Sequence, residues 1–214
     1  MRLYSYWRSS SAYRVRIALN LKGLDYETAP IHLLRDGGEQ LKPAFVKRNP
    51  QALVPVLEHD GATFTQSIAI IEWLEERFPR PALLPESPDE RARVRALAHL
   101  IADDVQPLNN LRVLRYLKHE LAVDDAARDA WYAHWTMTGL AAFEELLAGD
   151  AATGEFCHGD APGLADACLV PQVYNAERYR CDLSGCPTIE RIVQSCRTLD
   201  AFARAAPERQ PDAA

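Results

Sequence analysis

Residues 2–21 read RLYSYWRSSSAYRVRIALNL, and this stretch decides the fold of the first part of the chain. Its first five residues predict a short β-strand, and apolar residues at helical spacing from Tyr13 to Leu21 predict an amphipathic helix after it. We expect Ser10 or Ser11 to cap the start of that helix, and Lys22 and Gly23 to end it. Three hydroxyl side chains, those of serines 9–11, therefore lie where the strand meets the helix.

The rest of the first domain combines three strand patterns with two helical ones. In order they are a strand at 26–32, one helix within the connecting segment 37–49, a hairpin of Val56–Glu58 and Thr63–Thr65, and a helix that Ser67 caps and that runs to Phe78. The Asp-Gly pair between the two hairpin strands is typical of a tight turn. The predicted order is β-α-β-α-β-β-α, an α/β domain.

Prolines divide the chain into two parts. Four of them lie between Phe78 and Asp89, where they fix the backbone and remove hydrogen-bond donors. We therefore predict a first domain at 1–80, a linker at 81–88 and a second domain at 89–214. Beyond the linker only helical patterns follow, at 89–106, 108–120, 124–148, 163–179 and 187–205, before a polar tail at 207–214. The second domain should be all helical.

Composition excludes several classes of function. The 214 residues include 24 Lys plus Arg against 30 Asp plus Glu, a net charge of −6 that disfavours binding to nucleic acid. No apolar run is long enough to span a membrane, and Met1–Arg8 is charged where a secretory signal would be apolar. We expect a cytoplasmic protein. The five cysteines form no C-x-x-C pair, so reduced, packed thiols and no metal are expected.

The serine segment has one chemical and one structural interpretation. Free backbone N–H groups and the positive end of the helix dipole converge at such a helix start, where they stabilise a bound thiolate. Serines are also common helix caps, and on this segment alone capping is favoured.

Two later segments allow the same pair of interpretations. Val54-Pro55 precedes a strand, and a cis bond there would leave backbone groups free to pair with a peptide-like ligand. Gln66 and Ser67 stand at a helix start suited to a carboxylate. A plain loop and an ordinary helix cap are the alternatives.

Taken together, these segments carry a resemblance to a known family. The motifs are S-S-x-x-x-R-V-R-I-A-L at 9–19, Val54-Pro55, Q-S-x-A-I-I-E-W-L-E at 66–75 and L-A-D-x-x-L-V-P-Q at 164–172. The chain resembles zeta-class glutathione S-transferases, a family similar to maleylacetoacetate isomerases and maleylpyruvate isomerases. The resemblance covers essentially the whole chain. It implies the glutathione transferase fold, with a thioredoxin-like first domain and an all-helical second one, a glutathione cofactor and a homodimer.

The resemblance also implies roles for individual residues. Ser9, Ser10 and Ser11, with Arg8 beside them, are expected to be catalytic, because they match the turn at which the family activates the glutathione thiol. The residues expected to bind glutathione are Tyr13, Arg14, Gln40, Val54, Gln66, Ser67, Gln106, Asn110, Leu111 and Arg112.

Two positions depart from the family pattern. Ser11 stands where many members have cysteine, which matters little if glutathione itself brings the nucleophilic sulfur. Gly163 stands where a Ser or Thr usually caps a helix three residues before Asp166. Glycine is only slightly worse as a cap, so we assign Asp166 to structure.

The expected chemistry calls for cations. Rotation about a conjugated cis double bond needs a nucleophile that adds and leaves, and negative charge then develops on a substrate that already carries carboxylates. Arg8, Arg112 and Arg178 are the expected substrate-binding residues, at positions where similar maleylpyruvate isomerases have arginine. A solvated surface charge or an ion pair is the alternative for each of them.

Several functions remain open at this point. We favour isomerisation of maleylacetoacetate to fumarylacetoacetate in tyrosine breakdown, with glutathione transferase side activity. Gln106 favours that substrate, whereas the arginine set favours maleylpyruvate and gentisate-type aromatic degradation. A glutathione-conjugating transferase and a non-catalytic binding module on the same scaffold are further alternatives. A thiol-disulfide oxidoreductase is disfavoured, because no cysteine lies near the first helix.

Overall fold

A computed structural model describes residues 1–213 of the chain, which form two compact units. The first unit contains residues 1–83 together with the chain from Arg197 onward, and the second contains residues 84–196. We expected all residues after 88 to form one domain. The structure corrects this expectation, because the C-terminal segment packs with the N-terminal part of the chain.

The first unit is built on a four-stranded sheet with the order β2-β1-β3-β4. Its strands are β1 (Arg2–Ser5), β2 (Glu27–Pro30), β3 (Val56–His59) and β4 (Ala62–Thr65). β1 pairs in parallel with β2 and antiparallel with β3, which places Leu3 between Thr28 and Leu57. β3 and β4 form the predicted hairpin. Asp60 and Gly61 both have positive φ, 48° and 80°, as a type I′ turn requires.

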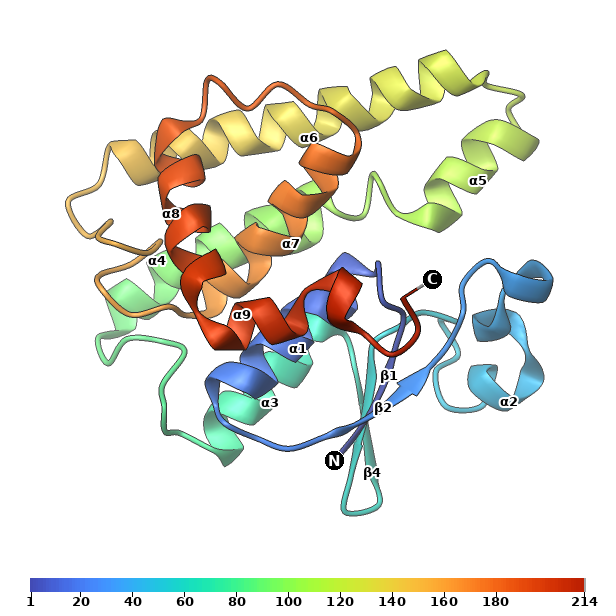
Figure 1. Ribbon diagram of the computed structural model, residues 1–214, viewed down its shortest axis with the longest axis horizontal. Coiled ribbons are helices and arrows are strands. Elements are labelled where there is room, and N and C mark those ends of the chain that lie inside the picture. Colours follow the sequence, from blue (N-terminus) through green and yellow to red (C-terminus); the bar gives the residue numbers. More distant parts are fainter. Residues whose placement is uncertain (214) are drawn as a thin grey trace. The chain divides into compact units, whose positions relative to one another are not determined.

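Helices cover both faces of this sheet (Figure 1). α1 (Ser10–Leu21) and α3 (Ser67–Arg77) pack together on one face, and the short α2 (Pro43–Val46) lies on the other. Two 3-10 turns, Arg35–Gly37 and Glu39–Leu41, precede α2. The predicted order β-α-β-α-β-β-α is thus confirmed.

The ends of α1 and α3 differ from prediction by one residue. α1 is capped by Ser9, not by Ser10 or Ser11, and the residue before α3 is Gln66, so Ser67 is its first residue and not its cap. α1 ends at Lys22 and Gly23 as predicted. Gly23 has φ +64°, and the N–H of Leu24 donates to the carbonyl of Leu19 (3.0 Å), the geometry of a Schellman cap.

A buried ammonium group fixes the start of the proline segment, the stretch between Phe78 and Asp89, to the first unit. Lys22 Nζ donates to Glu75 Oε2 (2.7 Å) and to the carbonyls of Phe78 (2.8 Å) and Pro81 (2.9 Å). The same Glu75 oxygen accepts from the N–H of Leu83 (2.9 Å). Each charge in this pair is therefore compensated by several hydrogen bonds.

The C-terminal segment joins the first unit through α9 (Asp200–Ala205), which packs against α1 (Figure 1). We predicted one helix over 187–205. Instead α8 (Pro187–Thr198) ends before Leu199, whose extended backbone (φ −83°, ψ 132°) redirects the chain into α9. Asn20 Nδ2 donates to the carbonyl of Ala201 (2.9 Å) and helps to hold α9 in place.

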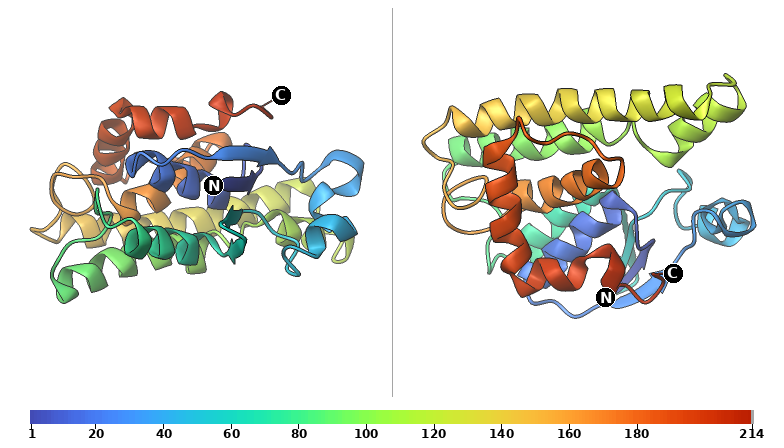
Figure 2. Two further views of the ribbon diagram at one scale, coloured as in Figure 1. Left: turned by 90° about the horizontal axis from the view of Figure 1, so that it is seen from below. Right: turned by 45° about the horizontal axis from the view of Figure 1, so that its top comes forward.

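The regular elements of the second unit, residues 84–196, are all helices, as predicted. In addition to α8 it contains α4 (Pro88–His99), α5 (Leu111–His119), α6 (Asp125–Ala148) and α7 (Leu164–Arg178). Figure 2 shows α6 as a long, unbroken helix. α4 packs against α7 and continues into a π-helical segment, Leu100–Val105, where we expected a regular α-helix.

Two buried features hold the second unit together. Asp166 near the start of α7 accepts from the N–H groups of Gly163 (2.8 Å) and Cys157 (2.9 Å), which supports the structural role assigned to it. Burial raises the pKa of this carboxyl group. Gly139 of α6 lies directly against Val105, so close that an added methyl group would overlap the Val105 side chain.

Within residues 1–213, no helix combines the length and apolar character needed to cross a membrane. The same residues contain no group of three or more His, Cys, Asp or Glu side chains placed to hold a metal ion. All five cysteines are free thiols, and burial raises the pKa of Cys157 well above its ordinary value.

Candidate active site

The serine turn is organised by Ser9. Its Oγ accepts from the N–H of Ala12 (3.2 Å), its own N–H donates to the carbonyl of Tyr6 (2.9 Å), and its carbonyl accepts from Tyr13 (2.8 Å). Ser10 is buried and Ser11 half-buried in the first turn of α1. The first N–H groups of a helix have no intrahelical acceptor, and Ser9 satisfies only that of Ala12. The turn therefore retains the positive character that suits an anion.

Arg8, just before this turn, is held by aromatic side chains. Its guanidinium lies 4.6 Å from the ring centre of Trp7, and Nη2 donates to the hydroxyl of Tyr6 (3.2 Å). The Tyr6 ring in turn contacts His32 edge to face (5.1 Å). Arg8 is half-buried, so the surface-charge alternative does not describe its surroundings.

Val54 and Gln40 lie near the aromatic side chains that hold Arg8. The Val54-Pro55 peptide is cis, and Val54 belongs to a buried cluster with Tyr4, Tyr6, Ala29, Phe45 and Val56, against which Trp7 and Leu33 pack. Gln40 is buried, with Nε2 3.5 Å from the carbonyl of Leu33. Its Oε1 is buried without a hydrogen-bond partner among residues 1–213, a position that needs a donor.

The third predicted segment is joined to the serine helix. Ser67 Oγ accepts from Arg14 Nη1 (3.2 Å), and both side chains are buried. Gln66 is exposed and has φ 66° and ψ 117°, which is rare for a residue other than glycine, and its amide donates to Gln51 Oε1 (2.7 Å). Tyr13 and Arg14, predicted to contact glutathione, are 5% and 1% exposed. The structure thus directs Arg14 toward Ser67 and packs Tyr13 inside the unit.

In the second unit, the predicted residues follow the π-helical segment. Gln106 comes directly after it, with its N–H donating to the carbonyl of Ile101 (2.9 Å). Asn110 caps α5 by accepting from the N–H of Arg112 (3.1 Å), while Leu111 is half-buried and Arg112 is exposed.

Sequence reasoning gave no role to Asn109. Its buried amide donates to Thr136 Oγ1 (2.9 Å) and to the carbonyl of Tyr132 (3.3 Å), which ties the turn before α5 to α6. The paired asparagines were the only signal for it, and they do not reveal which of the two points inward.

Arg178 is exposed at the end of α7, and its Nη1 donates to Asn175 Oδ1 (3.1 Å). The next residue, Tyr179, stacks on Tyr132 with ring centres 3.5 Å apart. Burial raises the pKa of Tyr132, so its hydroxyl stays protonated. Tyr132 thus contacts Tyr179, the residue after Arg178, through its ring and Asn109, in the turn before α5, through its carbonyl.

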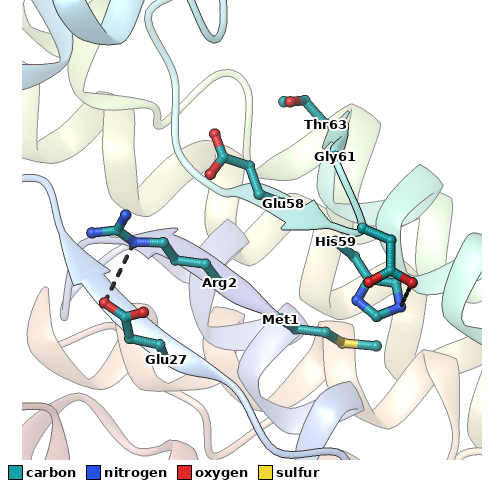
Figure 3. Close-up of a pocket in the computed structure, with 8 residues that line it drawn as sticks. Met1, Arg2, Glu27, Glu58, His59, Gly61 and Thr63 are labelled. Atoms are coloured by element: carbon teal, nitrogen blue, oxygen red, sulfur yellow. Dashed lines mark ion pairs between the residues drawn. The ribbon is translucent and has the colours of Figure 1, made fainter.

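An open hollow of about 610 Å³ is lined by Met1, Arg2, Glu27, Glu58, His59, Asp60, Gly61 and Thr63 (Figure 3). It lies at the start of β1, roughly 13 Å of strand away from the end that leads to the serine turn. Several of its side chains have partners within the protein: Arg2 pairs with Glu27 (3.4 Å) and Glu58 with Arg48 (3.2 Å), and His59 lies 3.3 Å from Asp60. None of the predicted site residues lines it, so it is no candidate for the active site.

The sheet order, the serine turn at the start of α1 and the helical second unit define a glutathione transferase fold, and residues 3–82 match the family model "Glutathione S-transferase, N-terminal domain". The chain is 53% identical to the "Probable maleylacetoacetate isomerase" of Vibrio cholerae, over 99% of this chain and 97% of that protein. It is 50% identical to the maleylpyruvate isomerase of a Ralstonia species, over the full length of both.

A solved structure with ligands shows the same fold. The maleylacetoacetate isomerase of Methylobacterium extorquens AM1, with bound malonate and glutathione, superimposes with a TM-score of 0.96 at 42% identity and full coverage of both chains. A solved maleylpyruvate isomerase, described as a bacterial glutathione S-transferase of the zeta class, superimposes with a TM-score of 0.97 at 50% identity over the full length of both chains. The chain therefore belongs to the zeta class of glutathione S-transferases, the family of the maleylacetoacetate and maleylpyruvate isomerases.

Proposed function

We propose that the protein is a glutathione-dependent cis-trans isomerase that converts maleylacetoacetate to fumarylacetoacetate. The observation that carries the proposal is the serine turn, an anion-stabilising helix start in the same unit as the Gln66-Ser67 turn. The relatives named above support it, since one is a maleylacetoacetate isomerase that binds glutathione together with a small dicarboxylate.

The residues of the first unit fit glutathione. Ser10, Ser11 and the first N–H groups of α1 would hold the sulfur, and these donors favour the thiolate over the thiol. Ser67, which Arg14 orients from inside the unit, and Gln66 would hold the γ-glutamyl carboxylate. A donor group of glutathione would bond to the buried Oε1 of Gln40, and the Val54 backbone would pair with the cysteinyl part of glutathione.

When bound, glutathione supplies a thiolate that adds to a conjugated double bond and leaves it again, so that the bond is single in between and can rotate. The protein must therefore stabilise the thiolate before addition and the charge on substrate oxygens after it. Arg8 is suited to the second task because Trp7 and Tyr6 hold it beside the serine turn. We propose Arg178 and Arg112 for the substrate carboxylates, and Gln106, Asn110 and Leu111 as further glutathione contacts.

Replacing Ser10 and Ser11 together by alanine should lower turnover by at least about tenfold, equivalent to about 1.4 kcal/mol of lost transition-state stabilisation. The expected cause is a higher pKa of the bound thiol, measured from the acid limb of the pH–rate profile. Ser87→Ala is the matched control, since Ser87 precedes α4 without a side-chain capping bond. Unchanged turnover in the double variant would place thiol activation elsewhere.

Arg178→Ala should raise the Michaelis constant for the acid substrate and leave the affinity for glutathione nearly unchanged, because Arg178 is assigned to a substrate carboxylate. Steady-state kinetics with each substrate varied in turn measures both. Arg180→Ala removes a nearby exposed arginine and should change neither. Loss of glutathione binding in Arg178→Ala would contradict the assignment.

Two other activities use the same thiolate. The Ralstonia relative supports maleylpyruvate as the alternative substrate, and conjugation of glutathione to electrophiles is the alternative reaction. Ultraviolet absorbance can monitor the conversion of each keto acid, with and without glutathione, in an assay coupled to a hydrolase that accepts only the trans isomer. The rates rank the two substrates. Failure to turn over either acid, with glutathione still bound, would favour the conjugating transferase.

We further propose a cytoplasmic homodimer, as the family resemblance implies. The absence of a membrane-spanning helix within residues 1–213 is compatible with this location. Light scattering of the purified protein measures the oligomeric state, and a monomer at micromolar concentration would contradict the dimer.

A further inference from the structure

The peptide groups of Trp7 are held by one side chain from the end of the chain and one from α1. The Trp7 N–H donates to Asp212 Oδ2 (3.0 Å), and the Trp7 carbonyl accepts from Arg16 Nη2 (3.0 Å). Both polar groups of one residue in an irregular segment thus have charged partners. Such charge-assisted hydrogen bonds are the stronger kind, and they leave the peptide little freedom to rotate.

Arg16 connects this peptide to the C-terminal helix. The side chain is fully buried, and besides Trp7 it donates to the carbonyl of Ala205 in α9 (2.9 Å) and to Ser5 Oγ (3.0 Å). Burial lowers its pKa to about 10, so the guanidinium is still protonated at neutral pH. Asp212 and Glu208 both act in the opposite direction and favour its charge.

The segment that carries Asp212 is itself fixed. The buried Gln210 amide donates to the carbonyls of Arg204 and Ala206, both at 2.9 Å, and so ties the chain after α9 back to that helix. The N–H of Ala213 donates to the Gln210 carbonyl (3.0 Å). The polar tail that the sequence analysis left without a role therefore has a defined path next to the serine turn.

We propose that Asp212 is a positioning residue for the active site. Through the Trp7 peptide it holds the Trp7 ring on which Arg8 rests, and it holds the backbone that leads into Ser9 two residues later. The inference rests on the proposed function of the serine turn and of Arg8. It adds that the C-terminal segment sets the geometry of the catalytic turn without touching the substrate.

Asp212→Ala should lower kcat/KM for the acid substrate by about tenfold, the effect of losing one charge-assisted hydrogen bond. The acid limb of the pH–rate profile should shift upward, because a loosened turn stabilises the thiolate less. Asp212→Asn keeps an oxygen acceptor for the Trp7 N–H and should recover at least half of the lost activity. Thermal unfolding of each variant shows whether the fold is intact, and a smaller folded fraction alone would not move the pH profile.

Two controls match these variants. Asp200→Ala removes an exposed carboxylate of α9 that pairs with Arg204 (3.4 Å), and it should change neither kcat/KM nor the pH profile. A chain that stops after Ala213 should behave like the full chain, whereas one that stops after Gln210 should behave like Asp212→Ala.

The outcomes separate this inference from the proposed function. A full chain without isomerase activity overturns the proposed function. The role of Asp212 can then still be tested, because ultraviolet absorbance of the bound thiolate measures the pKa of the thiol without turnover. An active full chain with an unaltered pH profile in Asp212→Ala overturns the positioning role. Equal losses in Asp212→Ala and Asp212→Asn overturn it as well, because the acceptor would then not be what matters.

Discussion

Replacing Lys22 by methionine should lower the free energy of unfolding by about 3–5 kcal/mol, the usual effect of removing one partner from a buried ion pair. The Lys22 side chain is 0% exposed, and it is the shared donor to Glu75 and to the Phe78 and Pro81 carbonyls. Without it, the buried Glu75 carboxylate loses its cationic partner, while the bond from the Leu83 N–H remains. Urea denaturation followed by circular dichroism at neutral pH measures the change.

Lys42→Met is the matched control for that experiment. Lys42 also faces a carboxylate, Asp36 at 3.8 Å, but its side chain is 52% exposed. An exposed pair of this kind contributes about 0–1 kcal/mol, so the control should unfold nearly like the original chain. Similar small effects of both substitutions would mean that the buried pair does not hold the proline segment in place.

Gly139→Ala should destabilise the protein by about 2 kcal/mol, although alanine is normally favoured over glycine inside a helix by about 1 kcal/mol. The reason is steric, because the new methyl group would overlap the Val105 side chain at the end of the π-helical segment. Gln106 follows that segment directly, so altered activity is expected together with the lower stability. Equilibrium denaturation and turnover measure the two effects.

A second substitution tests the cause. Val105→Ala removes the methyl groups that would overlap, so the Gly139→Ala/Val105→Ala double variant should be more stable than the sum of the two single changes predicts. Gly185→Ala serves as the control, because a methyl group there meets no atom within 4 Å. Additive effects of the two core substitutions would rule out the overlap as the cause.

Much of the first unit could be predicted because its signals are local. The strand and helix periods, the Asp60-Gly61 turn and the Gly23 helix end each depend on neighbouring residues, and all were confirmed. The cap of α1 was wrong by one position. Three serines in a row have the same intrinsic preference, and the bond that distinguishes Ser9, from the Ala12 N–H to its Oγ, is visible only in the structure.

The features that were missed depend on tertiary contacts. The π-helical segment lies where Gly139 lets two helices approach closely, and the break at Leu199 lets α9 join a different unit from α8. For the site, the family motifs identify residues close together in the sequence, whose roles stay predictions. The bond between Trp7 and Asp212 joins positions 205 residues apart, and no sequence pattern indicates it.

The first unit is discontinuous, since the whole second unit lies between its two parts in the sequence. Contacts across such a distance form late in folding, because a long loop must close before they stabilise anything. During synthesis, residues 1–83 leave the ribosome long before α9, with Arg16 still lacking its Ala205 acceptor and one face of α1 uncovered. A nascent chain can therefore form the sheet early, but its serine turn matures only with the last residues to be made.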